Sequence, residues 1–194
     1  MKSFALNGAL RTETGKKATK AVRAEGNIPC ILYGAGKVIA TFSVTNNDVR
    51  KLVYTPEIYV VELNIEGKSY KAIMQELQFH PVKDTILHID FLEVTETKPV
   101  VVKVPVVSVG HAEGVKAGGK LLKNVRSLRV KALYTNIPET LEINVENLGL
   151  NKSIQVKDLS FENLELIDNP ENVVLTVKPT RAAAAAMAAA RNGK

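Results

Sequence analysis

The sequence predicts a mainly β (α+β) protein that folds into two β-rich units. The first observation is composition. The 194 residues are 45% apolar but only 5% aromatic, with no Trp, so Val, Leu and Ile must fill the core, and branched side chains suit the pleated surface of a sheet. The second observation is that apolar and polar residues alternate over many short segments, which is the period of a strand. The third is a polar break at Thr95–Pro99, with strand-like segments on both sides.

Residues 1–94 are predicted to form the first domain from short strands and two short helices. Apolar residues at helical spacing indicate a helix over Lys16–Glu25, and Gly26 is a natural stop after it. A shorter helix is expected near Thr45, with Thr45 or one of the two Asn residues after it as the N-cap. The predicted strands of this domain cover residues 4–10, 28–34, 38–44, 58–65, 69–77 and 86–94.

Residues 95–180 are predicted to form a second β-rich domain, with strands over residues 100–109, 128–133, 139–145 and 172–177. Pro105 lies inside the first of these strands and suggests an edge position or a bulge, because Pro has no N–H to donate. The Gly-rich segment His111–Lys120 is expected to be a loop. Residues 181–194 are rich in Ala and are expected to form a flexible tail, because so short a helix is marginal alone in water.

The net charge of +6 is unevenly distributed along the chain. Residues 1–23 contain six basic residues and one acidic residue, giving +5, and residues 116–131 contain six basic residues and no acidic one, giving +6. Residues 132–180 contain three basic and eight acidic residues, giving −5. A basic run is most often a solvated face, but two dense runs also favour a nucleic-acid partner, whose phosphates bind Lys and Arg.

The first basic run has a helical pattern. Lys16, Lys20 and Arg23 lie at i, i+4 and i+7, so they share one face of the predicted helix. Apolar residues fall largely on the other side, and Arg11 lies just before the helix. This arrangement predicts a phosphate-binding edge, although it does not distinguish RNA from other polyanions.

Several classes of chemistry are disfavoured. A single cysteine, Cys30, excludes a disulfide framework and a multi-cysteine zinc site. Because Cys30 lies in an apolar strand, buried packing is favoured over a nucleophile–base pair with His80, His88 or His111. No apolar run approaches the roughly 18 to 20 residues of a membrane helix. We therefore expect no enzyme activity, no cofactor, no metal site and no membrane partner.

The segment Gly114–Lys120 matches the spacing GxxxxGK of a phosphate-binding loop and follows a Val-rich strand. The next residue is Leu121, where such a loop needs a hydroxyl to hold magnesium. A flexible basic loop is therefore favoured over a nucleotide-hydrolysing one.

The strand Leu87–Phe91 alternates between two faces. Leu87, Ile89 and Phe91 are predicted to face the core, and His88 and Asp90 the outside. A half-buried strand with a polar outer face explains this pattern, but His88 and Asp90 could also hydrogen-bond to base or ribose edges of RNA.

Gln75, on the preceding strand, has the same hydrogen-bonding capacity. It shares strand parity with Ile73 and Leu77, so it can face outward only if a bulge or a twist occurs there.

Four motifs resemble one family. They are Arg11-x3-Gly15-Lys16, Ile28–Gly34, Gln75–Pro81 and Leu87–Phe91. In order and spacing they resemble the bacterial ribosomal proteins that bind 5S ribosomal RNA, the general stress protein Ctc family. The second half, with Glu113-Gly114-Val115, Gly118-Gly119-x-Leu121, Ile137-Pro138-Glu139 and Asp158-Leu159, is similar to the long form of that family, so the resemblance covers residues 3 to 178.

This resemblance implies an N-terminal six-stranded β-barrel with short helices, a separate second β domain, and docking on the loop E region of 5S ribosomal RNA in the large ribosomal subunit. It also implies a cytoplasmic location, on the ribosome. Large-subunit proteins and 23S ribosomal RNA are candidate partners of the second domain. By motif position, the residues that would engage phosphates are Arg11, Lys16, Lys20 and Arg23. Those that would approach the RNA minor groove are Tyr33, Gln75, His88 and Asp90.

Two alternatives remain open. One is a stress-induced RNA-binding factor that acts mainly off the ribosome, which co-sedimentation with ribosomes under normal growth would distinguish. The other is a small phosphate-handling enzyme that uses the loop Gly114–Lys120, for which nucleotide hydrolysis abolished by Lys120→Ala would be the evidence.

Overall fold

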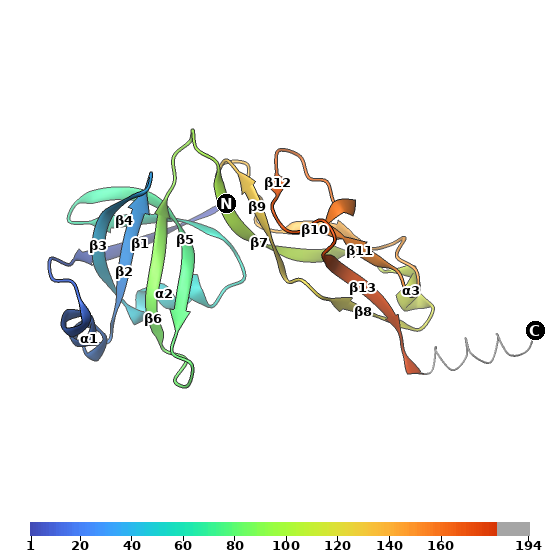
Figure 1. Cartoon of the computed structure of the whole chain (residues 1–194), viewed down its shortest axis with the longest axis horizontal. Helices are drawn as coiled ribbons and strands as arrows, with labels where there is room; N and C mark the ends of the chain where they lie inside the picture. Colours follow the sequence, from blue (N-terminus) through green and yellow to red (C-terminus); the bar gives the residue numbers. More distant parts are fainter. Residues whose placement is uncertain (182–194) are drawn as a thin grey trace, which may run out of the picture. The chain divides into compact units, whose positions relative to one another are not determined.

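The computed structural model describes residues 1–181, so the predicted Ala-rich tail, apart from Arg181, lies outside the described residues. The chain divides into two compact units (Figure 1). The first consists of Met1–Val100 together with Leu133–Ile137, and the second of Val101–Ala132 and the chain from Pro138 onward. The sequence places the end of the first domain at residue 94 and that of the second at residue 180, and both limits remain predictions.

The first unit is a closed barrel of six strands in the order β1-β3-β2-β6-β5-β4. Parallel pairing of β1 with β4 closes it, and β2 and β6 are the other parallel pair. The elements are β1 (Lys2–Leu10), α1 (Lys16–Ala24), β2 (Asn27–Gly34), β3 (Lys37–Thr45), α2 (Asn46–Val53), β4 (Tyr59–Ile65), β5 (Lys68–Phe79) and β6 (Ile86–Glu93).

The barrel interior is fully apolar. Alternate residues of the strands point inward, and the rings of Phe42 and Phe91 lie 5.7 Å apart in the core. The helix α2 closes one end of the barrel, because its residues Val49 and Leu52 belong to the same core (Figure 1). Thr45 is the N-cap of α2 and accepts a hydrogen bond from the backbone N–H of Asp48, so one of the predicted caps is confirmed.

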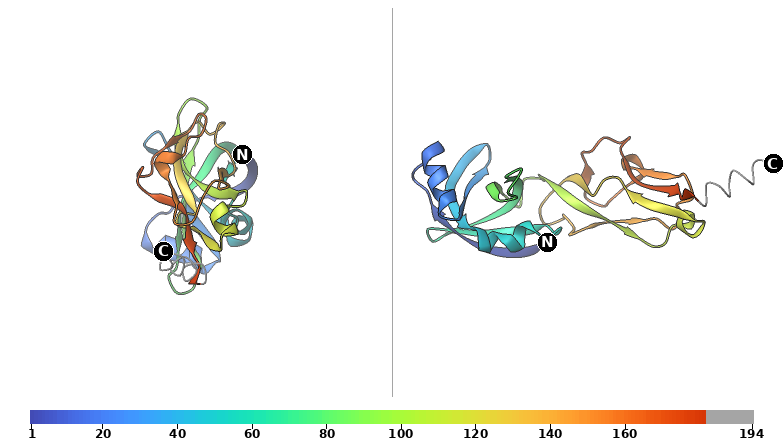
Figure 2. Two further views of the ribbon diagram at one scale, coloured as in Figure 1. Left: turned by 90° about the vertical axis from the view of Figure 1, so that its right-hand side faces the viewer. Right: turned by 90° about the horizontal axis from the view of Figure 1, so that it is seen from below.

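The helix α1 lies outside the barrel and contacts β2 (Figures 1 and 2). None of its residues is fully buried, so it is a surface helix held by one half-buried side. Gly15 before it has φ of +104° and Gly26 after it has φ of +81°. Both values lie in the left-handed region that favours glycine, and Gly26 therefore ends the helix as predicted.

Two bulges interrupt the pairing of β5 with β6. Met74 pairs with Phe91 and Glu76 with Asp90, which leaves Gln75 as an extra residue on β5. Gln78 pairs with His88 and Phe79 with Ile86, which leaves Leu87 as an extra residue on β6. The first bulge is the one that an outward Gln75 required, and Gln75 is exposed.

The second bulge corrects one prediction. Ile86 occupies the core position, whereas Leu87 is only half-buried and does not join Ile89 and Phe91 in the core. Strict alternation predicted the wrong face for Leu87 because the extra residue of the bulge shifts the alternation by one position, so that Ile86 faces the core instead.

The second unit contains two sheets, one with the order β10-β7-β9-β12 and one with the order β11-β13-β8. A barrel followed by a second β-rich unit confirms the predicted fold class. The elements are β7 (Val100–Val109), α3 (Glu113–Lys116), β8 (Gly119–Lys123), β9 (Ser127–Ala132), β10 (Leu141–Asn144), β11 (Ser153–Gln155), the 3-10 helix η1 (Val156–Asp158), β12 (Glu165–Leu166) and β13 (Val173–Pro179).

Of the two alternatives predicted for Pro105, the edge position is wrong and the bulge stays a prediction, and the loop predicted for His111–Lys120 is wrong in part. The strand that contains Pro105 lies between β10 and β9 and is not an edge strand. Its pairing with β10 begins at Val106, one residue after the proline, so the missing N–H costs no bond in that ladder. The segment His111–Lys120 is not a loop throughout, because it contains α3 and the start of β8.

Candidate nucleic-acid interface

Two polar side chains stand on the outer surface of β6. His88 and Asp90 lie two residues apart, so both point away from the core, while Ile89 between them is fully buried. Their side chains are 27% and 25% exposed, and His88 Nδ1 lies 2.6 Å from Asp90 Oδ1. An ionised carboxylate only accepts hydrogen bonds, so Nδ1 donates and the opposite ring nitrogen remains available to a ligand.

Tyr33 and Gln75 come from the strands on either side of β6. Asp90 pairs with Ile31 of β2, and Tyr33 is two residues further along, on the same face. On β5, Gln75 bulges next to Glu76, which pairs with Asp90. We call the outer surface formed by Tyr33, Gln75, His88 and Asp90 the polar face.

Burial raises the pKa of Tyr33 above its usual value, and the carboxylates of Asp90 and Glu76 raise it further. The Tyr33 hydroxyl therefore stays protonated at neutral pH and can donate a hydrogen bond. The polar face thus offers a phenol, an amide, an imidazole and a carboxylate within three adjacent strands.

Cationic side chains lie beside the polar face. On α1, Lys16 and Lys20 are exposed, and the helix has no acidic residue in its first turn. Arg11 follows β1, where its N–H donates to Thr41 O of β3, and its Nη2 lies 3.5 Å from Thr19 Oγ1 of α1. Arg11 is therefore half-buried between the barrel strands and the helix.

Arg23 links α1 to β6. Its Nε and Nη2 atoms both donate to the carbonyl of Leu87, at 3.0 and 2.8 Å. The bulge removes Leu87 from the ladder with β5, and Arg23 supplies its carbonyl with a partner. The structure therefore brings all eight predicted residues to the barrel, four as cations on or near α1 and four on the polar face.

Cys30 is buried beneath this surface. Burial strongly raises the pKa of its thiol, and its Sγ donates to Ile28 O at 3.5 Å. A neutral, buried thiol is a poor nucleophile, in agreement with a packing role. His80, a candidate base for it, instead accepts hydrogen bonds at Nδ1 from the N–H groups of Val82 and Lys83 and so holds the turn between β5 and β6.

The glycines of the segment Gly114–Lys120 serve close packing. A Cβ atom on Gly114 would lie 2.6 Å from the backbone carbon of Gly149, and one on Gly119 would lie 2.6 Å from Gly114 O. Lys120 lies on β8, opposite Lys178 of β13. The segment is therefore a helical turn and a strand packed closely against neighbouring backbone, and not an open loop that encloses a phosphate.

A basic helix beside a polar face offers cations to phosphates and hydrogen-bonding groups to base and ribose edges, which is the chemistry that an RNA-binding protein uses. Among residues 1–181, no group of three or more metal-ligating side chains could hold a metal ion. Within the same range, no helix is both long and apolar enough to cross a membrane.

Comparison with known proteins identifies the family. Residues 6–91 match the Ribosomal L25p family, and residues 99–181 match the C-terminal domain of ribosomal protein TL5. A protein of Porphyromonas gingivalis named large ribosomal subunit protein bL25 is 58% identical over 184 residues, which are 94% of this chain and 96% of that protein. Proteins of the same name from Bacteroides thetaiotaomicron and Parabacteroides distasonis are each 54% identical, over 98% and 97% of this chain and 99% of each relative.

The chain belongs to the family of large ribosomal subunit protein bL25, in its two-domain form. The resemblance found in the sequence motifs is therefore confirmed. Members of this family are ribosomal proteins and not enzymes, as expected for this chain.

Proposed function

We propose that the chain is a structural component of the large ribosomal subunit, in the cytoplasm, and that its barrel binds the loop E region of 5S ribosomal RNA. Membership of the bL25 family supports the ribosomal role. The observation that carries the RNA-binding part is the link between α1 and the polar face. Arg23 of α1 binds the carbonyl of Leu87, the residue before His88, and Arg11 contacts Thr19 of the same helix.

The two groups of residues have different roles in this proposal. Arg11, Lys16, Lys20 and Arg23 bind phosphates, which supply most of the affinity and make binding depend on salt. The polar face reads the shallow RNA minor groove, where 2′-hydroxyls and base edges are displayed. Both donors and acceptors are needed there, and the His88–Asp90 pair with Tyr33 and Gln75 supplies both.

The restraint of these side chains favours specific binding. His88 is held by Asp90, Arg23 by the Leu87 carbonyl, and Tyr33 and Arg11 are half-buried. Side chains already fixed before binding lose less conformational entropy when they bind a ligand.

The test is a filter-binding titration of 5S ribosomal RNA at several salt concentrations. We expect His88→Ala to weaken binding about tenfold with little change in salt slope, since it removes a groove contact. Lys20→Ala should reduce the slope by about 0.7 to 0.9, since it removes a phosphate contact. Lys68→Ala, at the opposite end of β5 from its turn to β6, is the matched control and should bind as the wild type does.

If His88→Ala and Lys20→Ala both bind like the Lys68→Ala control, the polar face is not the RNA site. Co-sedimentation with large subunits during normal growth tests the ribosomal role separately. A chain that stays with the free protein fraction under those conditions would contradict that role.

A further inference from the structure

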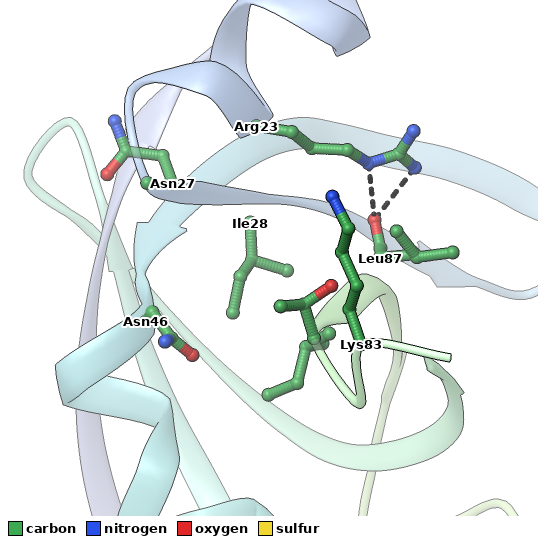
Figure 3. Close-up of a pocket in the computed structure, with 9 residues that line it drawn as sticks. Arg23, Asn27, Ile28, Asn46, Lys83 and Leu87 are labelled. Carbon is green, nitrogen blue, oxygen red and sulfur yellow. Dashed lines mark hydrogen bonds between the residues drawn. The ribbon is translucent and has the colours of Figure 1, made fainter. Parts of the chain in front are cut away.

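A pocket of about 260 Å³ opens on the barrel unit between the end of α1, the start of β2 and the turn between β5 and β6 (Figure 3). It lies outside the polar face, although its lining shares Arg23 with the basic residues of the first segment. The lining residues are Arg23, Gly26, Asn27, Ile28, Asn46, Lys83, Thr85, Ile86 and Leu87.

The pocket has an unbalanced positive charge. Its lining includes two cations, Arg23 and Lys83, and no carboxylate. In Figure 3 the Lys83 ammonium and the Arg23 guanidinium lie near one another along one side, while Asn27 and Asn46 lie on the other. Each Asn amide has two N–H donors. Both residues line the pocket, but the Asn27 amide points away from the two cations in Figure 3.

Arg23 is held in place before any ligand arrives. Two of its N–H groups bind the Leu87 carbonyl, which leaves three of its five donors for a ligand. The carbonyl is neutral, so the full positive charge of the guanidinium remains.

Lys83 lies on a turn that several hydrogen bonds hold together. Its backbone N–H donates to His80 Nδ1 at 3.2 Å, and the N–H of Asp84 donates to His80 O at 3.1 Å. His80 N also donates to Thr85 O at 2.8 Å. These bonds fix the backbone from which the Lys83 side chain reaches the pocket.

We infer that this pocket, the Arg23–Lys83 pocket, is a phosphate-binding site. A phosphate group offers several acceptor oxygens and a negative charge, which match a lining with two cations and no carboxylate. The phosphate comes either from the backbone of bound RNA or from a free phosphate compound. The first source rests on the proposed function, since Arg23 then belongs both to the pocket and to the RNA-binding edge of α1.

Two measurements on the full chain test this inference. In the first, inorganic phosphate is titrated at constant ionic strength, with chloride as the control, while NMR follows the side-chain amides of Asn27 and Asn46. Both amides should shift with phosphate but not with chloride, and Lys83→Ala should abolish the shifts. Lys83→Arg should retain them, and Lys68→Ala should not change them.

In the second, the salt dependence of 5S ribosomal RNA binding is compared among the same variants. If the phosphate belongs to the RNA, Lys83→Ala should reduce the slope by about 0.7 to 0.9 while Lys83→Arg keeps it. If phosphate shifts the amides but Lys83→Ala leaves the RNA slope unchanged, the ligand is a free phosphate compound.

The inference is overturned if Lys83→Ala changes neither the amide shifts nor the RNA slope. Failure of the proposed function has a different signature, in which Lys20→Ala and His88→Ala leave RNA binding unchanged. The phosphate titration contains no RNA, so it still tests whether the pocket binds phosphate if the proposed RNA-binding function fails.

Discussion

The two basic segments of the chain have similar charge in sequence but different surroundings in the structure. In the first, α1 presents Lys16 and Lys20 to solvent beside the polar face, and Arg23 binds a neutral carbonyl. In the second, residues 116–131, two cations meet carboxylates of the acidic stretch that follows. Arg129 Nε lies 2.8 Å from Asp168 Oδ1, and Lys131 Nζ lies 3.0 Å from Glu165 Oε2.

Strand pairing explains this difference. β12 pairs with β9 so that Glu165 stands opposite Lys131, which brings acidic and basic segments of the sequence together. Lys123 also turns inward, since its Nζ donates to the carbonyl of Val106. Charge counted along a chain therefore overstates the charge offered to a partner wherever a later strand supplies the counter-ions.

The largest effect is expected from a substitution that lowers the stability of the second unit but not that of the barrel. Gly114→Ala should destabilise the second unit by about 3 kcal/mol, because the new Cβ would meet backbone atoms of Gly149 and Leu150, which cannot move as a flexible side chain can. Urea denaturation followed by NMR should show the second unit unfolding earlier while the barrel signals and 5S ribosomal RNA binding persist. Loss of RNA binding in this variant, with the barrel still folded, would show that the second unit takes part.

The next effect compares the two basic segments directly. Replacing Lys16 and Lys20 together by Ala should weaken 5S ribosomal RNA binding on the order of tenfold to hundredfold and reduce the salt slope by about 1.4 to 1.8, since two phosphate contacts are lost. Replacing Lys116 and Lys120 together by Ala removes the same charge from the second segment. The affinity for 5S ribosomal RNA, measured by filter binding, should then remain near that of the wild type. Equal losses of affinity in both double variants would show that the two basic segments do not differ in RNA binding.

A third, smaller effect concerns the core beneath the polar face. The pKa of Cys30 is raised by burial, so its native thiol stays protonated at a pH where the unfolded chain has lost the proton. Above the unfolded pKa of about 8.5, the stability of the barrel should fall by up to about 1.4 kcal/mol per pH unit. Below that pH, the contribution of Cys30 is fully present.

Cys30→Ala tests this pH dependence, since Ala has no thiol to titrate. Urea denaturation of the barrel between pH 8 and 10 should show a shallower decline in the variant than in the wild type. Parallel declines would mean that other groups, such as Tyr33 with its raised pKa, account for the alkaline loss.

The smallest effect is expected at the ion pair of the second segment. Asp168→Asn keeps the shape of the side chain but removes its charge, and Arg129 is 53% exposed, so solvent screens the pair. The second unit should lose less than about 1 kcal/mol in urea denaturation, with no gain in 5S ribosomal RNA affinity. A clear gain in affinity would show that Asp168 masks an RNA-binding cation.

Much of the fold follows from local pattern in the sequence. Apolar patterns bounded by turn residues located all six barrel strands, and helical spacing with Gly26 located α1, because these segments have clear ends. Leu87 was misplaced because a bulge depends on pairing with β5, which alternation within one strand cannot reveal. In the second unit, β8 was missed because it begins at Gly119, a glycine that is required by contacts with distant segments, such as Leu150 and Val177.

The candidate site was predictable to a similar degree. His88 and Asp90 could be placed outside from their spacing, and Gln75 only on the condition of a bulge, which the structure contains. Lys83, Asn27 and Asn46 gave no signal, because they lie on three separate segments that only the closed barrel brings together.

Footprinting of 5S ribosomal RNA with the full chain tests the central claim most directly. Hydroxyl-radical cleavage should be reduced on both strands of the loop E region by the wild type and by the Lys68→Ala control, but not by the variant that combines Lys20→Ala with His88→Ala. Protection elsewhere on the RNA, or protection of loop E that survives in the double variant, would contradict the assignment of RNA binding to the polar face and α1.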